Sequence, residues 1–204
     1  MKPHRLRAGT VAAATLLSAA LAGCRALPAA HFYALQTEPP ASSGPPATVA
    51  PLIRIRHVGV PPEMDHLGLT HRRGATELSI SDTDRWSAPL AQLIQGTLTL
   101  DLGARLGFEH VVAADALTGS RPDQTGAQGA AAALDLDFVA LAADDTCAVT
   151  AQVNWTLAAP GSPAQHGTTH LEAAATGCPA GLPGALSDVL GQLADQLTRQ
   201  LAAP

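Results

Sequence analysis

The chain of 204 residues is poor in several residue types, and each shortage argues against a class of function. Lys2 is its only lysine, and residues 24–204 carry nine arginines against seventeen acidic residues, a net charge of −8. Because a nucleic-acid-binding domain needs a clustered basic face, this acidity argues against a nucleic-acid partner. Charged residues make up only 14% of the chain. The small, apolar remainder fits a surface that contacts a partner or lipid, or an alanine-biased composition, which we favour.

Catalytic motifs are also missing from the sequence. It contains no Gly-rich phosphate loop, no Cys-x-x-Cys and no His-Glu-x-x-His. Three serines near candidate strands lack the Gly-x-Ser-x-Gly context of an activated nucleophile: Ser79, Ser81 and Ser87. The acidic pairs Asp135/Asp137 and Asp144/Asp145 are interpreted as solvated charges at an edge and a turn. We therefore predict no catalytic residues, no cofactor and no enzymatic activity; an enzyme would need an apolar pocket with convergent titratable groups.

A metal site is weighed at three histidines that lie close together in sequence. His57, His66 and His71 would have to converge with a carboxylate such as Glu63 or Asp65. Their spacings match neither a helix face nor a strand face, so we expect surface histidines and no metal.

The chain also lacks an apolar run long enough for a permanent membrane anchor. The run from Ala8 to Ala22 is about 15 residues, whereas a spanning helix needs about 20. A basic head precedes this run, and small residues follow it, which is the pattern of an export signal over residues 1–23. The ending Leu21-Ala22-Gly23-Cys24 resembles a bacterial lipobox, in which the Cys sulfur is acylated and the signal is cut just before it.

The resemblance to a lipobox implies that Cys24 becomes the lipidated first residue of the mature protein. Each buried CH₂ contributes about 0.8 kcal/mol of membrane affinity, so two or more acyl chains, such as palmitate, anchor stably. An ordinary cleaved signal with Cys24 near the cut is the alternative. An Asp after the lipidated Cys commonly signals inner-membrane retention, and Arg25 therefore favours the outer membrane, with the domain facing the periplasm.

The mature chain divides into an N-terminal part over residues 24–51 and one domain over residues 52–204. The first part holds an aromatic strand at His31–Leu35, expected to pair with the main sheet. Residues 36–51, rich in proline, are predicted to be an extended linker or surface loop.

The rest of the chain predicts an α+β domain with a mostly antiparallel sheet and two helices on one face. Ser81 to Asp84 resembles an N-cap, so a helix is expected to start there. Its predicted apolar stripe includes Trp86, and the helix is expected to end at Gly103 and Gly107. Residues 115–128 are predicted to be a loop. The second helix is predicted over residues 182–201. Strands are predicted over residues 52–60 with a bulge near His57, and over 67–69, 75–80, 108–113, 134–141, 147–157 and 168–176.

The two remaining cysteines, Cys147 and Cys178, are candidates for a disulfide in an exported protein. If the last hairpin turns at Ser162–Pro163, the two cysteines lie directly opposite each other, within bridging distance. The same register places core-facing Val153 opposite Glu172, where the apolar pattern prefers a leucine, unless a bulge intervenes. Two free thiols remain the alternative.

Several motifs together resemble the ABC-type transport auxiliary lipoproteins, the PqiC-like family. The matching segments are His71-Arg72-Arg73-Gly74, Asp84-Arg85-Trp86-Ser87-Ala88-Pro89-Leu90, Phe32-Tyr33-Ala34-Leu35 and the strand from Ile53 to Pro61. The chain departs from the family where Glu63-Met64-Asp65-His66-Leu67 replaces the usual Tyr-Leu-Asp-Arg-Pro.

The resemblance implies a non-catalytic lipoprotein subunit of an ABC-linked lipid transport system that maintains membrane integrity. Its implied partners are an MCE-domain protein that spans the periplasm and the inner-membrane transporter; a homo-oligomer is left open. Candidate partner contacts are Arg72, Arg85 and Trp86, although Trp86 fits the core better and Arg85 could form a structural salt bridge. The alternative function is a stand-alone structural or assembly lipoprotein that docks on an outer-membrane β-barrel.

Overall fold

The computed structural model describes residues 28–41, 52–112 and 131–202. The predicted signal, the lipidation site Cys24 and the predicted loop at residues 115–128 lie outside the described residues. The elements in chain order are β1 (His31–Tyr33), β2 (Ile53–Gly59), β3 (Gly68–Arg73), β4 (Glu77–Trp86), α2 (Leu90–Leu106), the 3₁₀ turn η1 (Phe108–His110), β5 (Val111–Val112), β6 (Ala132–Ala143), β7 (Val149–Ala158), β8 (Gln165–Ala173) and α4 (Leu182–Ala202).

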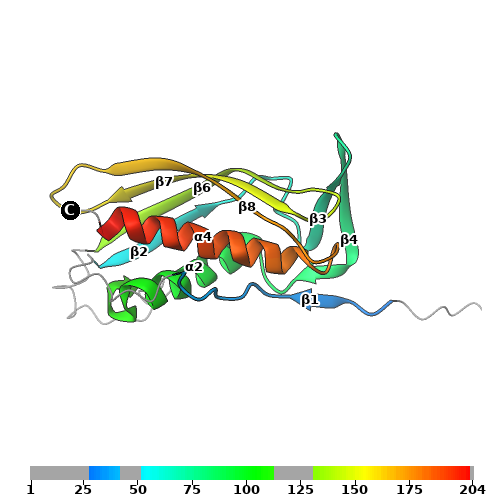
Figure 1. Ribbon diagram of the computed structural model, residues 1–204, viewed down its shortest axis with the longest axis horizontal. Coiled ribbons are helices and arrows are strands. Elements are labelled where there is room, and N and C mark those ends of the chain that lie inside the picture. Colours follow the sequence, from blue (N-terminus) through cyan, green and yellow to red (C-terminus); the bar gives the residue numbers. More distant parts are fainter. Residues whose placement is uncertain (1–27, 42–51, 113–130, 203–204) are drawn as a thin grey trace, which may run out of the picture.

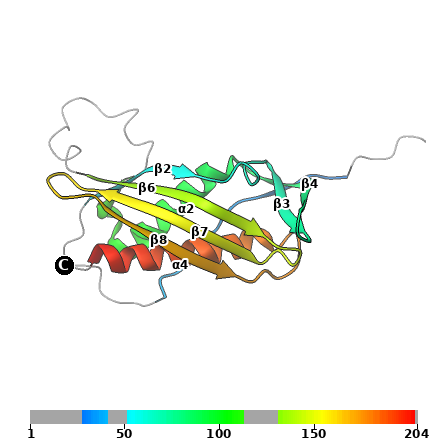
Figure 2. The same cartoon turned by 90° about the horizontal axis from the view of Figure 1, so that it is seen from above.

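A five-stranded sheet forms the body of the molecule, and the two helices pack side by side on one of its faces (Figures 1 and 2). Its strand order is β5-β2-β6-β7-β8. The longest pairings, β6–β7 and β7–β8, are antiparallel, whereas β2 pairs in parallel with β5 and with β6. The predicted α+β class is confirmed, and the sheet is mixed because β2 pairs in parallel on both sides.

The core side chains follow the periodicities that the sequence shows. Along β7, buried and exposed residues alternate, with Val149, Ala151, Val153, Trp155 and Leu157 facing the helices. On α4, buried residues recur at three- and four-residue spacing, so this helix presents a continuous apolar stripe to the sheet: Leu186, Val189, Leu190, Leu193 and Leu197. The bulge predicted in β2 is present between Ile55 and His57.

A second, three-stranded sheet with the order β1-β4-β3 stands at one end of the body. β1 pairs in parallel with β4, with Phe32 opposite Arg85. The expectation that β1 joins the main sheet is therefore wrong. Two backbone hydrogen bonds complete the junction: Trp86 N–H donates to Leu67 O (2.7 Å), and Ser87 N–H donates to Tyr33 O (2.8 Å).

The predicted start of the first helix is also wrong. The segment from Ser81 to Trp86 continues β4, and α2 begins only at Leu90, after Pro89 in the N-cap position. The polar side chains that resemble a helix cap instead bind one another and β1, and Pro89 N-terminal to the first turn suits a helix start because it lacks an N–H. At the other end, Gly107 with φ of +96° terminates the helix, whereas Gly103 lies inside it.

The register of the last hairpin differs from the prediction by three residues. Val153 pairs with Thr169 and Ala151 pairs with Leu171, which centres the turn on Gly161 rather than on Ser162–Pro163. Gly161 has φ of +76°, a conformation that glycine adopts without a steric penalty. The observed register keeps Leu171 on the core face, as the apolar pattern requires.

Candidate interaction surface

The three residues predicted to contact a partner all lie on the three-stranded sheet, but only two of them are accessible. Arg72 and Arg85 are exposed. Arg72 pairs with Leu78 across the β3–β4 hairpin, and the Nε of Arg85 donates to the Asp82 carbonyl oxygen at 3.0 Å. Trp86 is only 2% exposed and belongs to the core, so its assignment as a partner contact is wrong.

Large apolar side chains are exposed around the two arginines. Phe32 is 67%, Leu78 40% and Ile80 46% exposed. Leu78 and Ile80 are two residues apart on β4 and therefore project from the same face of the hairpin. Arg72 pairs with Leu78 and shares this face, so we call Arg72, Leu78 and Ile80 the outer face of the small sheet. Phe32 and Arg85, paired with each other, are also exposed on this sheet. Exposed apolar side chains that lie next to one another are a feature of binding surfaces.

The opposite face of the β3–β4 hairpin is turned towards the body. His71 and Ser79, paired across the hairpin, are partly buried. A hollow of about 410 Å³ lies here, lined by His71, Arg73, Gly74, Asp145, Cys178 and Pro179. The inner face therefore makes contacts with the body, whereas Arg72, Leu78 and Ile80 are exposed.

Asp84 fastens β1 to β4 through its carboxylate. Its oxygens accept hydrogen bonds from Ser81 Oγ (2.9 Å), Tyr33 Oη (3.1 Å) and Thr83 Oγ1 (3.2 Å), and His31 Nδ1 lies at 3.3 Å. The hydrogen bond from Ser81 above all lowers the pKa of Asp84 below its usual range. Because the folded pKa is lowered, Asp84 stabilises the fold above the unfolded pKa, and this contribution is lost as the pH falls through the folded pKa.

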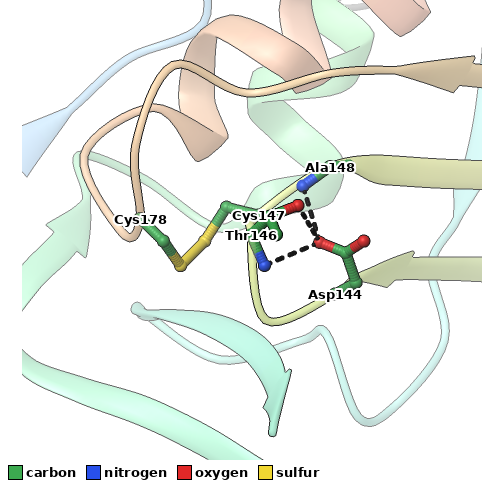
Figure 3. The surroundings of a disulfide bond; sticks show 5 residues. All are labelled: Asp144, Thr146, Cys147, Ala148 and Cys178. Carbon is green, nitrogen blue, oxygen red and sulfur yellow. Dashed lines mark hydrogen bonds between the residues drawn. A yellow bond between two sulfur atoms is a disulfide. The ribbon is translucent and has the colours of Figure 1, made fainter. Parts of the chain in front are cut away.

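A disulfide joins Cys147 and Cys178 next to the β6–β7 turn (Figure 3). Cys147 is buried with φ of +63°, Cys178 is exposed, and their Cα atoms are 5.2 Å apart. Cys178 lies beyond the end of β8, so the bridge forms outside the paired strands rather than between ladder partners. The predicted cysteine pair is therefore present in the structure, although the register from which it was argued is wrong.

Asp144 shapes the turn that presents Cys147. Its Oδ1 accepts hydrogen bonds from Thr146 Oγ1 (2.7 Å), Thr146 N–H (2.9 Å) and Ala148 N–H (2.9 Å) (Figure 3). These bonds, led by that of the Thr146 hydroxyl, lower the pKa of Asp144. Asp135, from the other acidic pair, binds Arg56, whose Nε lies 2.9 Å from Asp135 Oδ1. Both acids thus have structural roles.

The three histidines considered for a metal site do not form a group among the described residues. His57 lies beside Asp137 (3.5 Å), and His66 is exposed. The ligand atoms of His71 fall within 4.8 Å of the sulfurs of Cys147 and Cys178. Because those sulfurs are bonded to each other, they are not thiolates that a metal could bind.

Arg105 forms a buried centre that the sequence interpretation missed. Its side chain is 2% exposed, and its Nε donates to Asp195 Oδ1 at 2.6 Å. Its other nitrogens donate to the carbonyl oxygens of Asp101 (3.0 Å), Gly191 (3.1 Å) and Glu38 (3.1 Å). Arg105 therefore joins α2, α4 and the segment that follows β1.

Asp101, one turn earlier on α2, completes this centre. It is fully buried, and its Oδ1 accepts the Glu38 N–H at 2.9 Å and lies 3.8 Å from Arg105 Nη1. Removal from water raises the pKa of Asp101 from 3.8 to about 6, against the opposing effects of the Glu38 hydrogen bond and the Arg105 charge. An acidic and a basic residue four positions apart within the apolar stripe of a helix is the signal that could have identified this pair.

The segment from Ala34 to Ala41 lies against both helices and is called the strap. Besides its contacts with Asp101 and Arg105, Gln36 N–H donates to Ser187 Oγ at 3.0 Å. Gly191 permits the close approach of the strap, because a Cβ there would lie 2.6 Å from Glu38 Cβ. The start of the segment predicted to be a linker is thus packed on the domain; residues 42–51 lie outside the described residues.

Two other hollows lie over the body, with volumes of about 480 and 460 Å³. The first is lined by Ala140, Thr150, Ala151, Gln152, His170, Leu171 and Glu172. The second borders the Arg105 centre, in which Arg105 binds Asp195 and the Gly191 carbonyl oxygen. Within the described ranges, no helix is both long and apolar enough to cross a membrane.

Two crystal structures share this architecture. One, of an uncharacterized protein, is 18% identical, covers 85% of this chain and 99% of that chain, and has a TM-score of 0.66. The other, of a Xanthomonas campestris protein, is 14% identical, covers 82% and 92% of the two chains, and has a TM-score of 0.63. At these identities the similarity shows the fold alone. No curated protein sequence matches the chain.

Assignment to a family rests on the sequence itself. The family model for the ABC-type transport auxiliary lipoprotein component matches residues 33–198. The match begins at Tyr33 in β1 and ends at Thr198 in α4, and so includes the strap, both sheets and both helices. The chain belongs to the ABC-type transport auxiliary lipoprotein component family.

Proposed function

We propose that this protein is a non-catalytic auxiliary subunit of an ABC-linked lipid transport system, anchored in the outer membrane through acylated Cys24 and facing the periplasm. The family match over residues 33–198 carries the proposal. The lipobox-like ending at Cys24 and the basic residue Arg25 support the anchor and its membrane. The partner proposed from the family resemblance is an MCE-domain protein that bridges the two membranes.

The chemistry of the described residues agrees with a binding role. The buried charges of Asp101, Arg105 and Asp195 are used to hold the strap to the helices. The carboxylates of Asp84 and Asp144 accept hydrogen bonds that fix a strand pairing and a turn. The exposed arginines and apolar residues of the small sheet provide surface for a partner rather than reacting groups.

The proposed function is tested by affinity purification of the full-length lipoprotein from detergent-solubilised envelopes, with mass spectrometry of the co-eluting proteins after cross-linking. We expect an MCE-domain protein and its transporter to be recovered. Deletion of the gene should make the envelope leaky. Recovery of another outer-membrane protein alone, or of nothing above background, would contradict the transport role; the first outcome would support the assembly alternative.

The predicted contacts are tested in the same experiment with Arg85→Ala and Arg72→Ala. Both side chains are exposed, so these substitutions should leave the fold intact while reducing recovery of the partner. Arg199→Ala is the matched control, because Arg199 is an exposed arginine in the last turn of α4. If Arg72→Ala and Arg85→Ala recover as much of the partner as Arg199→Ala and the unmodified protein do, Arg72 and Arg85 are excluded from the interface.

A further inference from the structure

The position of β1 determines which end of the molecule lies nearest the membrane. Only six residues, 25–30, separate Cys24 from His31. At about 3.5 Å per residue, the chain from Cys24 to His31 reaches at most about 25 Å. β6, which runs along the body, has 12 residues and is about 40 Å long. An anchor at Cys24 therefore holds the end that carries β1 near the membrane.

The small sheet stands at this same end. Figures 1 and 2 show β1, β3 and β4 together there, opposite the end at which the C-terminal end of α4 and the β7–β8 turn lie. The inner face of the β3–β4 hairpin is turned to the body through His71, which lies near the disulfide. The outer face, with Arg72, Leu78 and Ile80, therefore points away from the body.

The chemistry of the outer face matches a lipid interface. Leu78 and Ile80 provide apolar side chains that can enter the boundary between headgroups and acyl chains, and Phe32 is exposed elsewhere on the same small sheet. Arg72 provides a cation for anionic phosphates on this face, and Arg85 adds a second on the small sheet. The exposed acids of β4 are Glu77, which pairs with Arg73 at the hairpin tip, and Asp82.

The charge of the rest of the chain supports this orientation. Residues 24–204 have seventeen acidic residues against nine arginines, so an anionic bilayer repels most of the domain. The end with exposed arginines and apolar side chains can approach such a surface with the smallest repulsion. A protein partner would not explain why this face lies within a short tether of the anchor.

We propose that the outer face of the small sheet rests on the anionic phospholipid surface in which Cys24 is anchored. The body then stands upright on the membrane, with the C-terminal end of α4 and the β7–β8 turn directed into the periplasm. This inference rests on the acylation of Cys24 in the proposed function. It assigns Arg72 to lipid rather than to the protein contact tested with Arg72→Ala, so the protein partner would dock on another part of the molecule.

The test measures the depth of a spin label on the full-length acylated protein in vesicles of phosphatidylethanolamine and phosphatidylglycerol. Ile80→Cys introduces the labelling site, because Cys24 is acylated and Cys147 is bonded to Cys178. Ala158→Cys, exposed at the far end of β7, is the matched control. We expect the label at position 80 to collide with oxygen but not with an aqueous nickel chelate, and the label at position 158 to collide with the chelate.

Equal exposure of both labels to the nickel chelate would overturn the proposal. If the label at position 80 is shielded from the chelate and its spectrum shows dipolar broadening between labels, the face contacts a second copy of the chain. If it is shielded only after an MCE-domain protein is added, the face contacts that partner. Either result also overturns the proposal. The mass of the N-terminal peptide reports acylation separately, so a missing acyl group is distinguished from a face that does not touch lipid. Leu78→Asp in the Ile80→Cys protein should restore collisions with the chelate.

Discussion

Among single residues, Arg105 is expected to be important for stability, because five acceptor groups from three segments surround its buried guanidinium. We predict that Arg105→Met lowers the free energy of unfolding by about 3–5 kcal/mol, since it leaves Asp195 and several carbonyl oxygens without their donor. Urea denaturation of the mature chain with Cys24→Ser measures this loss. Arg199→Met is the control and should change stability by less than about 0.5 kcal/mol. Similar values for both variants would show that the centre contributes little.

Asp101 should produce a characteristic dependence of stability on pH. Its folded pKa of about 6 lies above the ordinary value of 3.8, so between these values the folded chain holds a proton that the unfolded chain has released. Stability from this group therefore rises as the pH falls from about 7 to 4, by an amount on the order of 2–3 kcal/mol. Asp84 and Asp144, whose pKa values are lowered, act in the opposite sense at more acidic pH.

The contribution of Asp101 is isolated by comparing the unmodified chain with Asp101→Asn. Asparagine retains an oxygen that can accept the Glu38 N–H but does not titrate. The difference in unfolding free energy between the two proteins should change with pH between about 4 and 7 and be constant outside this range. A difference that is constant throughout would show that Asp101 titrates normally.

Among the links between elements, the disulfide joins the β6–β7 turn to the segment after β8 and so stabilises the end of the main sheet. It closes a loop with a sequence separation of 31 residues, which corresponds to about 3.5 kcal/mol on the chain-entropy estimate. We predict that Cys147→Ala with Cys178→Ala lowers the free energy of unfolding by about this amount. Reduction of the unmodified chain should reproduce the loss without changing a side chain. If reduction has no effect, the bridge does not contribute to the stability of the domain.

The elements also show which parts of the fold were predictable from sequence. β6, β7 and α4 were predicted within a few residues, because each buries one face and its periodicity records that burial. Ser81 to Asp84 was misinterpreted because its polar groups serve a strand about 50 residues earlier, a contact that local sequence does not contain. The pairing of Cys147 with Cys178 was predicted correctly although the predicted β7–β8 register is wrong. Cys178 lies after the end of β8, where the register of the paired strands does not fix its position.

The candidate site was only partly predictable, for a related reason. Arg72 and Arg85 were named as candidate contacts because they belong to the motifs that resemble the family, and the structure places both side chains on the surface. The packing of the strap was missed because Asp101 and Arg105 bind the backbone N–H and carbonyl oxygen of Glu38, groups that any residue type could supply. Proline-rich composition near the strap further suggested a linker where the chain is packed.

At the level of the whole molecule, the strap connects the proposed anchor to the core. A chain that begins at residue 42 would lack β1 and the hydrogen bonds of Gln36, Glu38 and Pro39. We predict a loss of about 2–4 kcal/mol in unfolding free energy, at about 1 kcal/mol for each hydrogen bond. Because Asp101 would become hydrated, its pKa should fall towards 3.8, and the pH dependence described above should disappear. A truncated chain that retains this dependence would show that the strap does not desolvate Asp101.

Gly191 gives the sharpest test of whether the strap is part of the fold. Alanine stabilises a helix interior by about 1 kcal/mol relative to glycine, but at this position its Cβ would lie 2.6 Å from Glu38 Cβ. Gly191→Ala should therefore destabilise the full mature chain, because the strap must move away from Arg105. In the chain that begins at residue 42, the same substitution should be stabilising, because the obstructing atom is absent. Urea denaturation of the four proteins measures this change of sign, and stabilisation in both backgrounds would mean that the strap does not lie against α4 in solution.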